Sequence, residues 1–328
     1  VEQIARLHPN LRPHFVHAGD EPVFASHTTY FAAAYGTFGT SPTMMSGHAL
    51  MCRRAVTDGV KVLLNGGAGN GTVTYDGIAR LRSLLRQGRW LTLFAELQGL
   101  RRFRGEVEDI VRKELFETPL FIALRWLRHP LRRRMHATPR RSFINPTFAA
   151  ESGAFARKNA FGDVLARWRA MDCWEQRAWG FSRITPGLPD FQLAEHGLDS
   201  RSPLVDRRIV EFTLALDDEF FLKDGIERRL ARMGLAHLIP NAIRLDPTRG
   251  RQDVDWAFRM RKDSETISAE LAKLADDPLI RSYLDVPGMQ EVWERFPNIA
   301  WNVAPISDEI LCHHQMMGAL TVGGFVRW

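Results

Sequence analysis

An apolar run that leads directly into a glycine-rich stretch constrains the fold more than any other feature of this sequence. Residues 60–64 read VKVLL, and residues 65–71, the glycine loop, read NGGAGNG. A short apolar run that ends at turn residues is typical of a buried strand in a parallel sheet. We therefore expect the glycine loop at the carboxyl edge of such a sheet, where ligands bind in open α/β folds.

The glycine loop supports two interpretations. Its backbone N–H groups are able to surround a phosphate, and the candidate residues are Asn65, Gly66, Gly67, Gly69 and Asn70. A tight structural turn is the alternative, because glycine adopts backbone conformations that other residues avoid. The loop matches neither the Walker lysine loop nor the spaced dinucleotide fingerprint. The residues by themselves leave both interpretations open.

Segments on the amino-terminal side of the glycine loop predict an α/β unit. By Ile4 the chain is already inside a short helix, an extended segment follows at residues 12–16, and a longer helix has Ser41 as its N-cap and Pro42 at its first position. The apolar positions of this longer helix repeat at helical spacing until Gly59. A strand, a helix and a strand in this order indicate a parallel sheet.

Beyond residue 77 the pattern becomes predominantly helical. Apolar residues recur at helical spacing in residues 78–87, 91–100 and 120–128. Loops are expected at residues 145–146 and 185–189, and a final helix is expected from about Ser307 until residues 321–324. We therefore divide one domain into a partial α/β part, residues 1–77, and a helical remainder, residues 78–328.

Composition and charge argue against several classes of protein. The chain of 328 residues is 45% apolar, which suits a globular core, and it has no apolar run of the roughly 20 residues that span a bilayer. Its formal charge of +6 is small for a protein that binds a polyanion. The arginines at 101, 102, 104 and 132–134 have only Phe103 among them, not the repeated aromatic residues that stack bases, so we expect solvent-exposed faces there. Neither a nucleic acid nor a membrane is an expected partner.

The cysteines and histidines predict no metal site. Cys52, Cys173 and Cys312 lie far apart and lack the spacing that a zinc site requires. Such cysteine usage fits a reducing compartment, and we expect a cytoplasmic location.

A second informative segment is GLDSRSPLVDRRIVEF, residues 197–212. Its simplest interpretation is structural: Asp206 caps a helix over Arg207–Leu216, and Arg201 pairs with Asp206. The third segment, residues 246–256, places Arg249 and Arg251 on either side of a glycine. Guanidinium groups suit phosphate or carboxylate, although a solvated loop explains this pattern equally well.

Taken in this order, the three segments resemble the synthetase domain of the asparagine synthase family, which includes β-lactam synthetases and lasso-peptide cyclases. That family has a strand ending in VLLSGEGxDE, then an RxPxLDxRxVEF segment, then a basic loop that contains glycine. The corresponding residues here are 62–71, 201–212 and 249–256. Gln252, Asp255 and Trp256 are typical of the divergent branch called asparagine-synthase-related.

The resemblance implies a fold, a reaction and two cofactors. The fold is α/β, a parallel-sheet PP-loop nucleotide-binding fold of the adenine nucleotide alpha hydrolase type, N-terminally incomplete here and followed by helices. ATP binds at the end of the sheet, and a carboxylate of aspartate, of a peptide or of another metabolite attacks the α-phosphate to form an acyl-adenylate. Ammonia or an amine then displaces AMP, while Mg²⁺ neutralises the leaving pyrophosphate.

The same resemblance implies the site residues. The glycine loop residues would contact the cofactor, and Arg249 and Arg251 would be catalytic. The candidate substrate-site residues are Tyr75, Asp76, Arg201 and Asp206.

The sequence departs from the family pattern at several points. Gly67 and Asn70 stand where the family has acids near the metal, and Arg249 stands where it has a lysine. The family's SGGxDS pyrophosphate loop is expected upstream of Val1, because the sequence begins inside a helical pattern, and no glutaminase domain is expected. A non-catalytic relative that serves as a binding or scaffold protein is therefore the alternative to a ligase.

Overall fold

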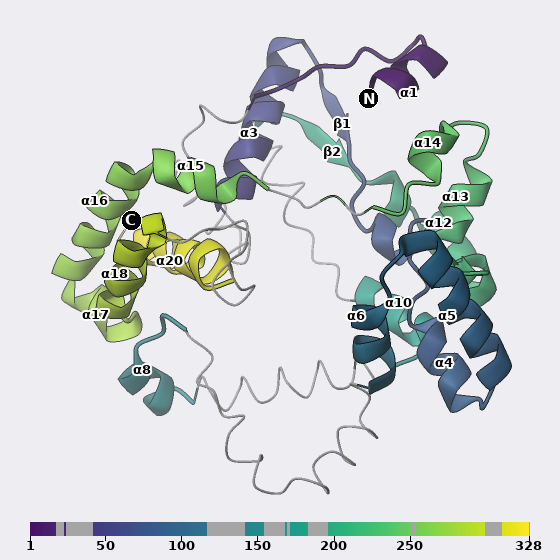
Figure 1. Ribbon diagram of the computed structural model, residues 1–328. Coiled ribbons are helices and arrows are strands. Elements are labelled where there is room, and N and C mark those ends of the chain that lie inside the picture. The colour runs from purple at the N-terminus through teal and green to yellow at the C-terminus, as the bar shows by residue number, and fades with distance from the viewer. Residues whose placement is uncertain are drawn as a thin grey trace, which may run out of the picture.

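The structure is helix-rich, and its described strands form two small sheets. The computed structural model describes residues 1–17, 23, 42–116, 142–153, 168, 171–182, 196–248, 250, 254–298 and 310–327. Within these ranges one sheet is a parallel pair and the other is an antiparallel hairpin. Figure 1 shows the parallel pair beside α3, with helices α4 to α6 on one side of the view and α15 to α20 on the other.

The parallel pair joins two segments that lie far apart in the sequence. Strand β1 (Val62–Leu64) pairs with β2 (Asp199–Arg201), with Val62 opposite Asp199 and Leu64 opposite Arg201. The strand predicted before the glycine loop is therefore confirmed, but its burial is not, because Val62 is 40% exposed and Leu64 is 68% exposed. Within the described ranges β2 is the only partner of β1, and a strand with one partner keeps much of its surface accessible.

The segments before β1 agree only in part with the predicted α/β unit. Helix α3 (Pro42–Thr57) forms as predicted and is followed by Gly59 at a φ of 77°. Helix α1 (Glu2–Leu7) also forms. The strand expected at residues 12–16 is wrong, because these residues form no regular secondary structure and Phe15 is 64% exposed. Pro13 lacks the backbone N–H that a strand ladder uses, which opposes pairing here.

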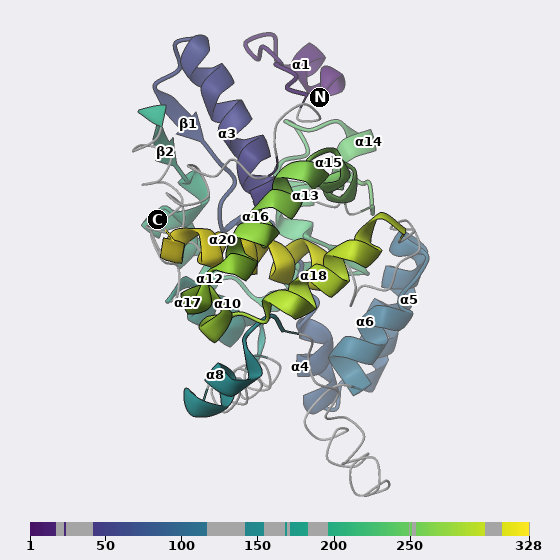
Figure 2. The same cartoon turned by 90° about the vertical axis from the view of Figure 1, so that its left-hand side faces the viewer.

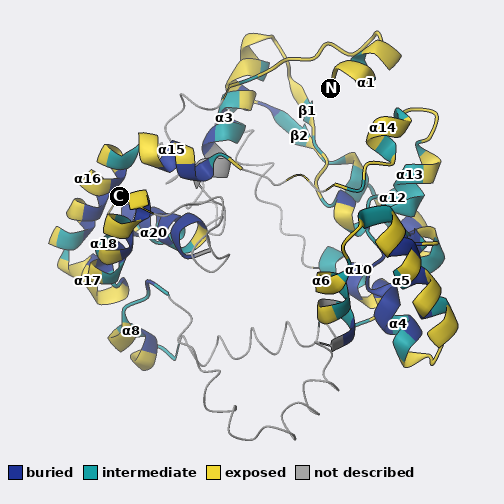
Figure 3. Cartoon of the chain, viewed as in Figure 1, coloured by how far each residue is buried: buried dark blue, intermediate teal, exposed yellow. Residues whose placement is uncertain are grey.

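Helices α4 (Arg80–Arg86) and α5 (Trp90–Arg104) pack against each other and build the first helical core. Helix α6 (Glu108–Val111) and a π-helical turn (Arg112–Phe116) complete it. Figure 3 shows α4 as mostly buried. The core side chains are Ile78, Leu81, Leu84, Leu93, Leu100, Leu115 and Leu222. The helices predicted at residues 78–87 and 91–100 are thus confirmed, whereas residues 120–128 lie outside the described ranges.

A second group of elements follows helix α10 (Cys173–Phe181). Asp206 caps α12 (Arg207–Leu214) by accepting a hydrogen bond from the Arg208 N–H, which confirms the predicted cap. Next comes the antiparallel hairpin of β3 (Leu222–Lys223) and β4 (Ile226–Glu227), and then α13 (Arg229–Gly234) and α14 (Asn241–Arg244). This hairpin packs against α5 through β4.

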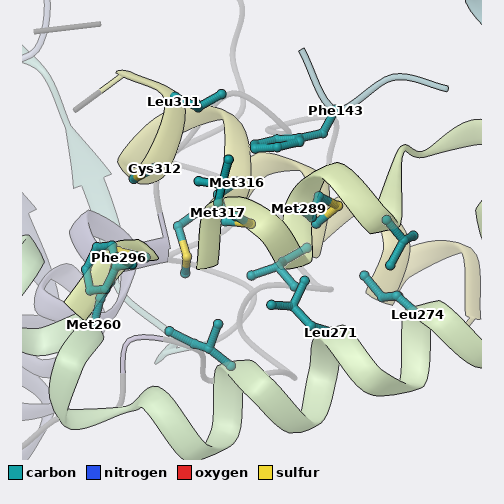
Figure 4. Close-up of a cluster of buried hydrophobic side chains, with 14 of the residues drawn as sticks. Phe143, Met260, Leu271, Leu274, Met289, Phe296, Leu311, Cys312, Met316 and Met317 are labelled. Atoms are coloured by element: carbon teal, nitrogen blue, oxygen red, sulfur yellow. The ribbon is translucent and has the colours of Figure 1, made fainter. Parts of the chain in front are cut away.

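The carboxyl-terminal helices build a separate hydrophobic core, which Figure 4 shows in close-up. They are α15 (Trp256–Lys262), α16 (Ser264–Asp276), α17 (Pro278–Tyr283), α18 (Val286–Arg295), a π-helical segment (Ile310–Met316) and α20 (Met317–Arg327). Figure 2 looks at these helices face on, with α16 and α18 in front of α20.

Two local predictions in this region are wrong. The final helix does not end at residues 321–324, because α20 continues through Arg327. A Cβ on Gly323 would come within 2.8 Å of Leu274, so this glycine permits close helix packing instead of stopping the helix. Residues 145–146 do not form a loop: Asn145 caps α8 (Pro146–Glu151) and Pro146 occupies its first position.

The described residues support the predicted fold class in part. They show a helix-rich chain with a small parallel sheet, whereas the larger sheet of a PP-loop fold is not seen among them. The pairing of β1 with β2 joins residues from both sides of the boundary predicted at residue 77. Among the helices that the structure describes, we find none whose length and hydropathy would let it cross a bilayer.

Candidate functional site

The pairing of β1 with β2 brings the glycine loop against the second informative segment. Asn65 is the first residue after β1, and its backbone N–H donates to the carbonyl of Arg201 at 2.9 Å. Its Nδ2 donates to Ser200 Oγ at 2.9 Å, and its Oδ1 accepts from Ser202 Oγ at 2.6 Å. The same Oδ1 accepts from the Gly67 N–H at 2.8 Å. The Asn65 carboxamide therefore holds the start of the glycine loop on residues 200–202.

Two glycines of the loop, Gly67 and Gly69, allow its backbone to pack closely against residues 202–204. A Cβ on Gly67 would lie 3.0 Å from Ser202 Oγ, and one on Gly69 would lie 2.8 Å from Leu204 Cδ1. By contrast, a Cβ on Gly66 would meet nothing within 4 Å. The N–H groups of Gly67, Gly69 and Gly71 donate inside the loop. Any phosphate contact by this backbone would thus depend on the remaining amides, on the open side near Gly66.

A pocket of about 570 Å³ lies directly beyond the glycine loop. Three of the predicted site residues, Asn70, Tyr75 and Asp76, line it. The other lining residues are Thr74, Ile78, Ala79, Arg82, Arg104, Asp109, Ile110, Glu114, Trp168, Gln176 and Arg228. We call this cavity the loop pocket. It combines the residues after the glycine loop with α4, α5, α6, α10 and the residue after the β3–β4 hairpin.

One wall of the loop pocket is a hydrogen-bonded chain of buried groups. The Tyr75 hydroxyl lies 3.5 Å from Gln176 Oε1, and Gln176 Nε2 donates to the Trp168 carbonyl at 2.8 Å. Behind this wall, the Arg177 guanidinium lies over the rings of Tyr75 and Phe221, at 5.3 Å and 4.3 Å from their centroids. Burial raises the pKa of the Tyr75 hydroxyl far above its usual value, so this hydroxyl stays protonated and keeps its proton for Gln176 Oε1.

Ion pairs fix most of the charges around the loop pocket. Arg82 pairs with Glu114 at 2.9 Å, and Arg104 pairs with the buried Glu227 at 3.1 Å. The prediction that Arg104 belongs to a solvent face is therefore wrong, because folding places it beside a buried carboxylate at the pocket. Arg228 also lines the pocket, and within the described structure its guanidinium has no carboxylate partner.

The other predicted site residues lie apart from the loop pocket or outside the described ranges. Arg201 pairs with Asp199 at 2.6 Å, not with Asp206 as its simplest interpretation held. Asp206 caps α12 and bonds to Arg208, which lowers the pKa of its carboxyl to about 2. Neither Arg201 nor Asp206 lines the loop pocket. Arg249 and Arg251 lie outside the described residues, so their catalytic roles stay predictions.

Sequence reasoning missed Gln176, Glu114 and Arg228 as pocket residues. They come from three elements that are distant in the sequence, and none belongs to a recognisable motif. One local signal was present for Arg228. It follows an Asp-Gly pair, Asp224-Gly225, which is typical of the turn of a β-hairpin. A hairpin turn fixes the register of the strand that follows it, which here ends just before Arg228.

The described residues provide little for a metal ion. No group of three or more His, Cys, Asp or Glu side chains within them is placed to hold one. Position 67 has no side chain, and position 70 offers a neutral amide where a carboxylate would suit Mg²⁺ better. We therefore derive no step through a protein-bound metal.

Comparison with models of known protein families finds one family that matches most of the chain. Residues 12–302 match the family described as asparagine synthase, and this range includes the glycine loop, β2 and the loop pocket. No curated protein and no solved structure matches the chain significantly. Because the family match covers well over half of the sequence, the chain belongs to the asparagine synthase family.

Proposed function

We propose that the chain forms an amide bond in an ATP-dependent reaction that proceeds through an acyl-adenylate. Membership of the asparagine synthase family supports ATP-dependent amide-bond formation in general. The observation that carries the proposal is the pair of hydrogen bonds from the Asn65 carboxamide to Ser200 and Ser202, which we call the Asn65 bridge. This bridge joins two of the segments by which the sequence resembles the family. Their meeting point is the carboxyl end of β1, where ligands of α/β folds bind.

In this proposal the substrate is a small-molecule or peptide carboxylate. One of its carboxylate oxygens attacks the α-phosphorus of ATP, the bond to the β-phosphate oxygen breaks, and pyrophosphate leaves. Ammonia or another amine then attacks the acyl carbon, loses a proton, and AMP leaves. Arg249 and Arg251 would stabilise negative charge on the reacting phosphate, and Mg²⁺ would arrive bound to the nucleotide phosphates.

In this proposal the glycine loop and the loop pocket bind different ligands. The open side of the loop near Gly66 would face the nucleotide. The loop pocket, with Tyr75 and Asp76 in its wall, would take the carboxylate substrate. Asn70 belongs to both features and marks where the two ligands would meet.

A second candidate function is a non-catalytic binding or scaffold protein. Gly67 and Asn70 favour it, because neither supplies the carboxylate that the family pattern places near the metal. Such a protein would keep the Asn65 bridge for stability and would not need to bind ATP with Mg²⁺.

Exchange of labelled pyrophosphate into ATP separates the two functions. The experiment uses the full-length protein with Mg²⁺ and a panel of carboxylates that includes aspartate. We expect exchange that depends on one carboxylate and disappears in a Gly69→Val variant, whose side chain would collide with Leu204. Gly234→Val is the matched control and should keep the exchange, because Gly234 is exposed, a Cβ there would meet nothing within 4 Å, and it does not line the loop pocket. If a folded protein shows no exchange with any carboxylate, and calorimetry detects no ATP binding, the scaffold function is the better account.

A further inference from the structure

We propose that the loop pocket is a binding site for a monoanionic carboxylate and that Arg228 is the residue that holds its charge. The proposal deepens the proposed function and rests on it for the role of the loop pocket, but the binding step itself requires neither ATP nor catalysis. It would also define the substrate class if the chain is a ligase: a single carboxylate attached to a body that is neutral and partly apolar.

The first step of the argument is that Arg228 lacks an acceptor. Its Nε is buried and makes no hydrogen bond, and we find no ion pair to its guanidinium within the described part of the chain. The neighbouring Arg232 is different, because its guanidinium donates to the carbonyls of Glu227, Arg244 and Asp246. Because this Nε is enclosed by protein, an oxyanion in the pocket would contact the terminal nitrogens of the same guanidinium, which make no ion pair within the described residues.

The second step is that the fold holds Arg228 in place. Its backbone is left-handed, with a φ of 53°, and its N–H points to the Asp76 carbonyl at 3.4 Å. The hairpin before it is tied to α5, because Glu96 Oε2 accepts from the Gly225 N–H at 2.9 Å. A strained, well-anchored backbone position beside a pocket is typical of a residue with a binding role.

The third step is the charge around the loop pocket. Among the described residues, three arginines and three acids line it, and Glu114 and the adjacent Glu227 already neutralise Arg82 and Arg104. Asp109 pairs with Arg112 at 2.8 Å. Among the described lining residues, Arg228 is thus the cation without a carboxylate partner, and one such cation matches one negative charge. A single carboxylate fits this balance better than a phosphate group with two charges.

The fourth step is the rest of the lining. Ile78, Ala79 and Ile110 offer apolar contact, and Tyr75 and Trp168 add aromatic side chains. The exposed Asn70 supplies an amide group for a neutral polar substituent. A pocket with a few polar groups among apolar ones, and a volume of about 570 Å³, suits a compact organic molecule.

Binding without nucleotide tests the proposal. The probes are aromatic and branched aliphatic monocarboxylates, their primary amides, inorganic phosphate and pyrophosphate, each titrated into the full-length protein by calorimetry. We expect at least one carboxylate to bind, its amide to bind at least about tenfold more weakly, and Arg228→Gln to cause a similar loss. Arg229→Gln is the matched control, because Arg229 is adjacent in the sequence but does not line the pocket.

Several outcomes would overturn the proposal. One is that no carboxylate of the panel binds, and another is that Arg228→Gln and Arg229→Gln have equal effects. Tighter, Arg228-dependent binding of phosphate or pyrophosphate would make this a phosphate site instead. If Arg228→Gln does not fold by circular dichroism, Arg228→Lys replaces it, and we expect an intermediate loss because lysine keeps the charge but not the paired N–H groups. The absence of pyrophosphate exchange would count against the proposed function only.

Discussion

The Oδ1 of Asn65 accepts a hydrogen bond of 2.6 Å from the hydroxyl of Ser202, a residue 137 positions further along the chain. Together with the bond from Asn65 to Ser200, this contact fixes the glycine loop on β2 and the turn after it. The loop pocket begins at the other end of the same loop, at Asn70. The geometry of the candidate site therefore depends on a small number of polar contacts made by one side chain.

We expect Asn65→Ala to lower the free energy of unfolding by about 1–2 kcal/mol, because three hydrogen bonds of this carboxamide are lost. Ser202→Ala should cost less, and the double variant should show a coupling energy of about 0.5–1.5 kcal/mol. Urea denaturation measures these values. Asn298→Ala, at an exposed position, is the control and should change stability by less than about 0.5 kcal/mol. Strictly additive effects would show that the two side chains do not interact.

Gly99 allows α5 to touch the β3–β4 hairpin. A Cβ on Gly99 would lie 2.5 Å from the backbone carbonyl of Asp224, and backbone atoms cannot move aside as a side chain can. We expect Gly99→Ala to lower the free energy of unfolding by about 2–3 kcal/mol. Gly180→Ala is the matched control in another helix, where a Cβ meets nothing within 4 Å. Thermal denaturation should show the control unchanged or stabilised by about 0.5–1 kcal/mol. Equal effects of the two variants would contradict the close approach.

Glu96 should make stability depend on pH. Burial raises the pKa of this carboxyl above its ordinary value of 4.5, although the Gly225 N–H and Arg80 oppose the shift. The folded state then binds the proton more tightly than the unfolded state, so stability falls as pH rises from 4.5 through the folded pKa. Glu96→Gln removes this ionisation and keeps an acceptor for Gly225. We expect urea denaturation at about pH 5 and about pH 8 to show that the stability of the variant relative to the wild type is greater at the higher pH. A constant difference would contradict the raised pKa.

Local signals in the sequence predicted several elements correctly because their causes are local. Pro42 and Gly59 bracket α3, and Asp206 caps α12, through contacts within a few residues. Such features need no knowledge of the rest of the chain.

The sequence-based predictions failed where contacts between residues distant in the sequence determine the structure. A glycine such as Gly323 commonly marks the end of a helix, but here it lies inside α20, where its missing side chain leaves room for Leu274. Arg104 has the pattern of a surface arginine, yet the buried Glu227, 123 residues away, pairs with it. Arg228 gains its position from a hairpin and from Glu96, and a single sequence cannot place these elements next to the glycine loop.

Asn70→Asp tests the metal requirement of the proposed ligase. Asn70 is exposed at the junction of the glycine loop and the loop pocket, so a carboxylate there would be accessible to Mg²⁺ on a bound nucleotide. If the chain binds ATP with Mg²⁺, this variant should lower the Kd for ATP by about tenfold with Mg²⁺ and raise it with EDTA, where the added charge repels the phosphates. Asn298→Asp, which adds the same charge at an exposed position away from the loop pocket, should change neither value. Equal Kd values for the wild type and Asn70→Asp under both conditions would mean that this end of the loop does not face the nucleotide phosphates.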